Sequence, residues 1–198
     1  METLNLTLEW KGPFGHVPDG PNPWFYEQAE LKESPPGIYL QTLFIEDQYF
    51  VYYVGETNDL LRRTREHIVG FLGGQYWHYD PMATIKNKKE RSNPYNPASA
   101  QYQQFLTRSS VLRAMAYEWL AALQLFVWID AKRELDGQGR RLVESAIITT
   151  VMNPQSEPNS KWLCDNSERV PDSPVELGMI FRDGYSVAGL PNRLLHPG

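Results

Sequence analysis

Arg63 and His67 are the residues whose types and spacing most directly suggest chemistry. They are four positions apart, so a helix would project both from one face. Arginine offers a planar, permanently charged fork that suits a phosphate, and histidine can take or give a proton near neutral pH. A phosphodiester would fit both side chains. A histidine taken alone is more often a packed or surface residue, so the neighbouring elements decide the interpretation.

Two tyrosines come just before this pair, on a hairpin that begins with GIY (37–39) and ends with YVG (53–55). If residues 46–48 form a three-residue loop, Ile45 faces Tyr49 and Tyr39 faces Gly55, which places Tyr39 and Tyr53 on one face. A two-residue turn, or a bulge, would put them on opposite faces. The alternative role is a strand pair stabilised by cross-strand aromatic contacts. The other face then holds an apolar set for the core: Ile38, Leu40, Phe44, Phe50, Tyr52 and Val54.

Glu144 is a carboxylate in an apolar setting. On the helix predicted for residues 140–152, apolar residues follow it by three, four and seven positions, so it lies on the apolar stripe. A carboxylate there is unfavourable unless it is paired or binds a metal. One explanation is an ion pair with Arg140, Arg141 or Arg63. The other is a Mg²⁺ ion, which proteins usually hold with one or two carboxylates, waters and phosphate oxygens.

Length and composition limit the kind of protein that carries these residues. A chain of 198 residues with 41% hydrophobic and 22% charged residues is typical of one globular domain. The first residues, METLNLTLEWKG, do not resemble a secretion signal, and no apolar run approaches the roughly 18 residues of a membrane span. We therefore expect a cytoplasmic protein that does not engage a membrane. Cys164 is the only cysteine, which excludes an internal disulfide and predicts a packed or surface thiol.

Charge is distributed unevenly along the chain. The net charge is -5, but residues 62–141 contain 13 of the 19 basic and 7 of the 24 acidic residues, a local balance of +6. This balance permits an anionic ligand along the middle of the chain, with acidic ends that limit nonspecific binding. Charge alone would favour an ordinary solvated surface.

The predicted elements place these residues on one small mixed sheet. Residues 1–36 are rich in Gly and Pro and predict an irregular arm, in which Trp24 and Phe25 act as anchors. After the hairpin, Thr57 or Asn58 could cap a helix that runs to about Val69. A polar loop (about 70–98), a helix (about 99–120), a buried strand (123–130), the helix at 140–152 and a tail with a hairpin around 179–187 follow. The order strand, strand, helix, helix, strand, helix favours a sheet covered by helices.

The ordered combination of GIY, YVG, an arginine and histidine on the next helix and a late helical glutamate resembles the GIY-YIG nuclease superfamily. The resemblance covers about residues 37–159. It implies an α+β fold with a small three-stranded mixed or antiparallel sheet flanked by helices, in the order β-β-α-α-β-α. The chain would then divide into an N-terminal arm (1–36), a nuclease core (37–159) with an insertion at about 70–98, and a C-terminal extension (160–198).

The resemblance also implies roles for the candidate residues. Tyr39 and Tyr53 would line the active site, Arg63 would bind the scissile phosphate, His67 would assist, and Glu144 would hold one divalent cation. That cation would be Mg²⁺, with Mn²⁺ able to substitute. The resemblance leaves open whether Tyr39 or His67 is the general base.

Two features depart from the family pattern, and one is ambiguous. Thirteen residues separate GIY from YVG, more than in the family's compact hairpins, and Glu56 stands where several members carry a lysine. His67 is the obvious substitute for that lysine, and the lysines of the polar loop are the others. The family's closing asparagine has two candidates: Asn159, at the more usual distance from the glutamate, and Asn153, nearer the helix end.

The substrate implied is double-stranded DNA, cut by one-metal hydrolysis of a phosphodiester bond. The lack of an appended DNA-binding module is similar to the family's Type II restriction endonucleases, some of which act as homodimers. The alternatives are a structure-specific or repair nuclease guided by a partner protein, and a nuclease-dead DNA-binding module. The polar loop mixes basic and aromatic residues suited to phosphate contact and stacking. The DNA-binding candidates are Arg62, Lys86, Lys88, Lys89 and Arg91.

Overall fold

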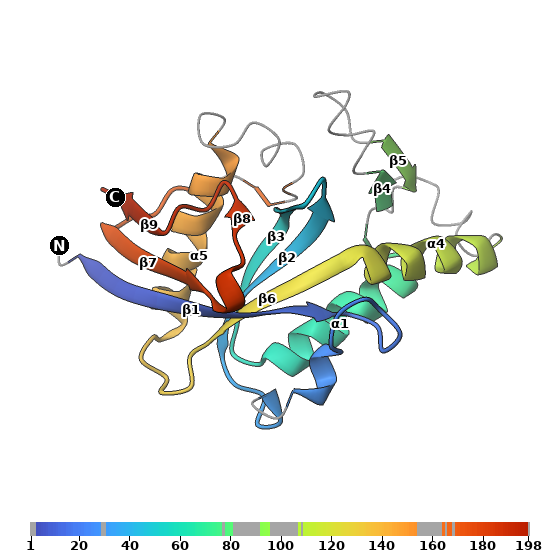
Figure 1. Cartoon of the computed structure of the whole chain (residues 1–198), viewed down its shortest axis with the longest axis horizontal. Coiled ribbons are helices and arrows are strands. Elements are labelled where there is room, and N and C mark those ends of the chain that lie inside the picture. The colour runs from blue at the N-terminus through green and yellow to red at the C-terminus, as the bar shows by residue number, and fades with distance from the viewer. Residues whose placement is uncertain are drawn as a thin grey trace.

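The fold is α+β, built on one curled mixed sheet (Figure 1). The computed structural model describes residues 3–28, 31–76, 78–80, 92–95, 107, 109–153, 164, 166–167 and 169–197. Helices α1 (Leu60–Leu72), α4 (Ser109–Ala122) and α5 (Gly137–Met152) pack around the sheet. Two short strands, β4 (His78–Asp80) and β5 (Ser92–Tyr95), pair with each other in a separate sheet.

The main sheet has seven strands in the order β8-β3-β2-β6-β1-β7-β9, so the predicted three-stranded sheet is wrong in size. Its central antiparallel part, β3-β2-β6, consists of the strands that the sequence predicted. The additional strands come from the two ends of the chain. The bounds are β1 Leu4–Gly15, β2 Gly37–Ile45, β3 Gln48–Thr57, β6 Leu123–Ile129, β7 Val175–Phe181, β8 Val187–Ala188 and β9 Arg193–His196.

Strand β1 occupies residues that the sequence predicted to be irregular. It pairs antiparallel with β6 and parallel with β7, and it extends the sheet beyond the predicted core. The apolar residues Leu4, Leu6, Leu8 and Trp10 alternate with polar ones and pack on one face of the sheet. The Gly and Pro residues that follow this alternation are the reason that an irregular arm was predicted here. Phe25, predicted as an anchor, is fully buried in a short 3-10 turn, Phe25–Glu27.

The tail does not form the predicted hairpin around residues 179–187. Strand β7 pairs with β1 and β9, whereas β8 pairs with the far edge of the sheet at β3. The turn between them, Arg182–Gly184, therefore connects strands that lie near opposite ends of the sheet. The predicted strand at 123–130 is confirmed as β6.

The helices agree with the predictions in place but differ at their ends. Helix α1 begins one turn after Thr57, because Asp59 is its N-cap and accepts a hydrogen bond from the Arg62 N–H. Helix α5 begins at Gly137 instead of Arg140, since Asp136 caps it through the Gly139 N–H. Helix α4 ends two residues later than predicted, and its predicted beginning falls largely outside the described residues.

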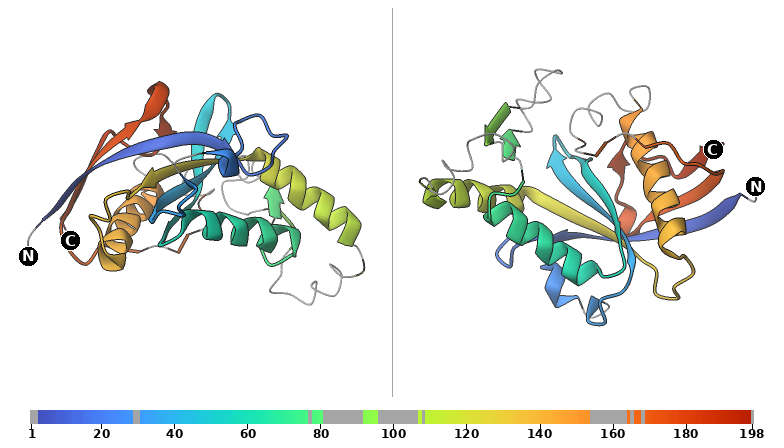
Figure 2. Two further views of the ribbon diagram at one scale, coloured as in Figure 1. Left: turned by 90° about the horizontal axis from the view of Figure 1, so that it is seen from below. Right: turned by 180° about the vertical axis from the view of Figure 1, so that it is seen from behind.

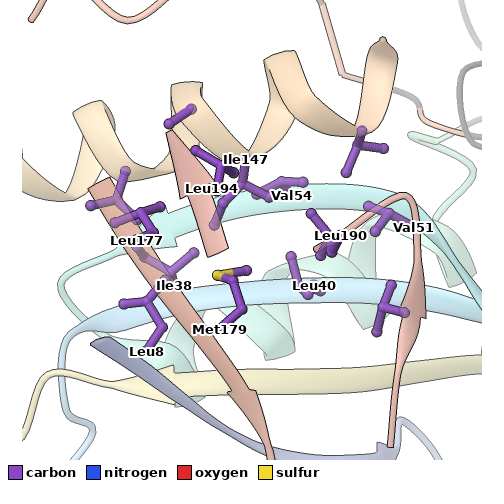
Figure 3. Close-up of a cluster of buried hydrophobic side chains, with 14 of the residues drawn as sticks. Leu8, Ile38, Leu40, Val51, Val54, Ile147, Leu177, Met179, Leu190 and Leu194 are labelled. Atoms are coloured by element: carbon purple, nitrogen blue, oxygen red, sulfur yellow. The ribbon is translucent and has the colours of Figure 1, made fainter. Parts of the chain in front are cut away.

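Helices α5 and α1 cover opposite faces of the β2–β3 hairpin (Figure 2). Helix α5 packs Ile147 against Ile38, Leu40 and Val54, together with residues of β7 (Figure 3). Helix α1 packs on the face that carries Tyr39. Three residues of the apolar set predicted for the core do not pack on the α5 face. Phe50 and Tyr52 pack on the α1 face, and Phe44 is 52% exposed. No helix in the described part of the chain is long and apolar enough to cross a membrane.

Candidate active site

The turn between β2 and β3 is shorter than predicted. It has two residues, Glu46 and Asp47, with positive φ angles of 50° and 63°, and its twist matches that of the strands it joins. Ile45 consequently pairs with Gln48 and not with Tyr49. Without another irregularity, this turn would have placed the two tyrosines on opposite faces.

A bulge at Tyr52 offsets the shorter turn, because β3 holds one extra residue there. The bulge restores the predicted pairing of Tyr39 with Gly55. Tyr53 therefore shares a face with Tyr39, and the centroids of the two rings lie 6.1 Å apart. The predicted arrangement of the tyrosines is confirmed, although the predicted loop is not.

The glycine of YVG leaves the space that the tyrosine of GIY fills. A Cβ atom on Gly55 would lie 2.3 Å from both the Cζ atom and the hydroxyl oxygen of Tyr39. Such a distance is too short for non-bonded atoms, so the Tyr39 ring lies directly on the Gly55 backbone. At the same end of the hairpin, a Cβ atom on Gly37 would lie 2.2 Å from the carbonyl oxygen of Trp128. Both glycines are thus required by close approach within the sheet.

Helix α1 brings Arg63 and His67 to the Tyr39 hydroxyl. The Nε atom of Arg63 donates a hydrogen bond to the hydroxyl oxygen at 3.2 Å, and the Nε2 atom of His67 lies 2.9 Å from the same oxygen. His67 also makes edge contacts with both tyrosine rings. Arg63 additionally pairs with Glu66 at 3.1 Å. The predicted face of the helix is therefore confirmed as the partner of the two tyrosines.

The protonation of this group follows from its burial. Burial, helped by the charge of Arg63, lowers the pKa of His67 to about 3, so its imidazole is neutral at pH 7. Burial also raises the pKa of Tyr39, and this outweighs the lowering by Arg63. Arginine can only donate, so we assign the Tyr39 proton to the bond with His67, whose Nε2 atom accepts it. Tyr39 at rest is a neutral phenol with its proton directed at a neutral histidine.

Glu144 lies on helix α5, which packs on the face of the hairpin opposite to that of Tyr39. It is 6% exposed, and the backbone of Glu56 lies close enough to lower its pKa against the effect of burial. Burial raises its pKa, while a salt bridge from the Nη1 atom of Arg169 at 3.1 Å opposes that rise. The partner is thus Arg169, and not any of the three arginines that the sequence suggested. The charge of Glu144 raises the pKa of both Tyr39 and Tyr53, so the carboxylate acts on the tyrosines through space.

A divalent cation would have Glu144 as its single protein carboxylate. Among the described residues, no group of three or more His, Cys, Asp or Glu side chains could enclose a metal ion. A magnesium ion with one carboxylate, waters and a substrate phosphate needs no such group. The buried carboxylate, whose charge acts on both tyrosines, is compatible with that mode, provided that the side chain of Arg169, which is 56% exposed, turns away.

Glu56, at the position of the family lysine, forms ion pairs that connect β3 to the beginning of α5. Its carboxylate lies 3.5 Å from the Nε atom of Arg140 and 4.0 Å from the Nη1 atom of Arg141. Arg140 is 4% exposed, and it also lies 3.6 Å from Asp130 at the end of β6. These ion pairs join β3, β6 and the beginning of α5. They fix the end of the YVG strand beside α5.

Asn166 completes the site, and sequence reasoning missed it. Its side-chain amide donates to the Val54 carbonyl at 2.8 Å and accepts from the Val54 N–H at 2.7 Å. A side chain thereby replaces a neighbouring strand at the centre of YVG. The contact joins residues 112 positions apart, and no local pattern indicates it. Cys164, predicted as a packed or surface thiol, is buried beside Asn166.

The remaining candidates are not part of this group as described. Arg62 is 58% exposed and pairs with Glu66 one turn later. Asn153 is the C-cap of α5. Asn159 lies outside the described residues, so the choice between the two asparagines stays open. The remaining DNA-binding candidates also lie outside the described residues: Lys86, Lys88, Lys89 and Arg91. The three lysines among them are the other possible substitutes for the family lysine.

Tyr39, Tyr53, Arg63 and His67 come together, and Glu144 acts on the two tyrosines through its charge. They come from both strands of one hairpin and from helices on its two faces. Comparison of the chain with family models, with curated proteins and with solved structures finds no match in any of the three.

Proposed function

We propose that the protein is a divalent-cation-dependent endonuclease that hydrolyses phosphodiester bonds in duplex DNA. The observation that carries the proposal is the Tyr39 hydroxyl, which lies between the Nε atom of Arg63 and the Nε2 atom of His67. A phenol so placed can pass a proton to the histidine as it takes one from a water molecule. The resemblance to the GIY-YIG superfamily supports the same assignment.

In the mechanism that we propose, Tyr39 and His67 act together as the base. The Tyr39 oxygen accepts a proton from the attacking water while its own proton moves to the Nε2 atom of His67. The resulting hydroxide attacks phosphorus in line, and the bond from phosphorus to the 3′ oxygen breaks. Because the resting pKa of Tyr39 is raised, a phenolate would be costly, and a concerted transfer to His67 avoids it.

Arg63 has two roles in this mechanism. Its guanidinium is 31% exposed, so it can contact a phosphate while its Nε atom orients Tyr39. Its charge stabilises the negative charge that develops on the phosphoryl oxygens. Burial, helped by the charge of Arg63, keeps His67 neutral at rest. An arriving phosphate would offset that charge and favour the protonated histidine.

Glu144 is the residue that would hold a Mg²⁺ or Mn²⁺ ion. Bound there, the ion would supply Lewis-acid stabilisation of the phosphate and of the leaving 3′ oxygen. Tyr53 would orient the phosphate or water through its hydroxyl, whose pKa is raised by burial and lowered by the charge of Arg63. Glu56 is held by Arg140 and Arg141, and His67, which contacts Tyr39, would take the role of the family lysine.

Among nucleases, we propose a site-specific Type II restriction endonuclease that acts as a homodimer. Support comes from the resemblance and from the positive balance of residues 62–141. Incubating purified protein with duplex DNA of mixed sequence, with Mg²⁺ or Mn²⁺, tests the proposal. Discrete fragments would support restriction, and cuts confined to flaps or lesions would favour a repair nuclease. Binding without cleavage would indicate a DNA-binding module, and cleavage of no DNA with either ion would refute the enzyme.

A further inference from the structure

Arg169 is a cation bound to the carboxylate that the proposed function assigns to a metal ion. Its Nη1 atom lies 3.1 Å from the Oε2 atom of Glu144. The carboxylate is 8% exposed, whereas the arginine side chain is 56% exposed. One partner of this ion pair is therefore fixed in the site, and the other can leave it for solvent without unfolding any structure.

The backbone that carries Arg169 is fastened on both sides of the site. The hydroxyl of Thr149, on α5, donates a hydrogen bond to the Arg169 carbonyl. Three residues earlier, Asn166 makes its two hydrogen bonds to Val54. Release of the guanidinium from Glu144 therefore requires rotation of a side chain, not movement of the segment.

The structure also offers a place for the displaced side chain. Arg169 lines a surface cavity of about 240 Å³ between α5 and the residues before β7. Arg141 and Asp172 line the same cavity. A guanidinium that leaves Glu144 can remain there beside the carboxylate of Asp172.

We propose that Arg169 is a positioning residue that occupies the cation position of Glu144 and yields it to a divalent cation. This inference rests on the proposed function of Glu144 as the metal ligand. The guanidinium of Arg169 contacts the buried carboxylate where a cation would bind. An incoming ion would therefore displace this guanidinium from Glu144.

Binding of Mn²⁺ to the full chain without DNA tests this competition. Arg169→Ala should bind Mn²⁺ about three- to tenfold more tightly than the wild type, since a half-exposed ion pair no longer competes. Arg141→Ala is the charge control, because Arg141 also acts on Glu144 through space but does not contact it. Its Mn²⁺ affinity should change by less than that of Arg169→Ala. An equal gain in both variants would show general electrostatics, and an unchanged or weaker affinity in Arg169→Ala would refute the competition.

Thermal melts give a second readout that does not depend on cleavage. Arg169→Ala leaves a buried carboxylate unpaired, so its melting temperature should fall without Mn²⁺ and rise more than that of the wild type when Mn²⁺ is added. Glu144→Gln should respond to Mn²⁺ in neither assay. If wild type and Arg169→Ala both fail to bind Mn²⁺, the metal role of Glu144 fails with the inference. If both bind equally, the inference alone fails.

Discussion

Replacing Gly55 by alanine should displace Tyr39 from its position between Arg63 and His67. The added Cβ atom would lie 2.3 Å from the Tyr39 hydroxyl oxygen, whereas ordinary contacts begin at 3.4 Å. The hydrogen bonds of β2 and β3 hold both backbones, so the ring has to move by roughly 1 Å. Overpacking of this kind costs about 1–3 kcal/mol of stability. A shift of roughly 1 Å in a catalytic group lowers the rate by on the order of 100-fold.

Urea unfolding and single-turnover cleavage of duplex DNA measure the two effects. Gly137→Ala is the matched control, because the nearest atom to its added Cβ would be 3.5 Å away, at the Nη1 atom of Arg141. Gly137 is the first residue of α5, so alanine there should leave stability and cleavage nearly unchanged. If Gly55→Ala cleaves like the control, Tyr39 does not need the position that the structure gives it.

A double-mutant cycle identifies the source of the clash. In a Tyr39→Ala background, the ring is absent, so Gly55→Ala should cost at least about 1 kcal/mol less than in the wild type. An equal cost in both backgrounds would mean that the alanine disturbs the strand itself, and the argument from the ring would be wrong.

Three further predictions concern other parts of the chain. Burial lowers the pKa of His16 from 6.5 to about 4, so its contribution to stability is complete above pH 6.5 and is lost as the pH falls toward 4. The loss of unfolding free energy between pH 7 and pH 5 should therefore be about 2 kcal/mol smaller in His16→Leu, and an unchanged pH dependence would contradict the buried neutral histidine. Arg140→Ala, which leaves Asp130 and Glu56 without their buried partner, should destabilise the fold by about 3–5 kcal/mol. Arg141→Ala, at a side chain that is 59% exposed, should cost less than about 1 kcal/mol, and equal costs would show that the buried ion pairs do not matter. Replacing the loop lysines Lys86, Lys88 and Lys89 by alanine should weaken DNA binding. The slope of log affinity against log salt concentration should fall by about one unit per lost phosphate contact, and an unchanged slope would exclude the loop from the interface.

Local spacing predicted the part of the site that one helix and one hairpin build. Arg63 and His67 are four residues apart, and helical geometry alone places them on one face. The pairing of Tyr39 with Gly55 was also predicted, but through two errors that cancel. The two-residue turn and the bulge each shift the register by one residue, in opposite directions. A sequence pattern with period two cannot distinguish one long loop from that combination.

Contacts between distant segments account for what the sequence did not predict. Strand β1 finds partners in β6 and β7, more than 100 residues away, and Gly and Pro residues interrupt its alternation. The ion pair of Glu144 with Arg169 and the contact of Asn166 with Val54 depend on how the tail crosses the edge of β3. The position of Glu144 on an apolar stripe predicted a positively charged partner, but the sequence contains several arginines and does not distinguish among them.

The rate of DNA cleavage by Tyr39→Phe tests the central claim most directly. Phenylalanine keeps the ring over Gly55 and removes only the oxygen that Arg63 and His67 contact. Under single-turnover conditions with Mg²⁺, the account predicts unchanged DNA affinity and a cleavage rate lower by about 100- to 10,000-fold. A rate within about threefold of the wild type would show that Tyr39 neither takes nor passes the proton, and would contradict the mechanism.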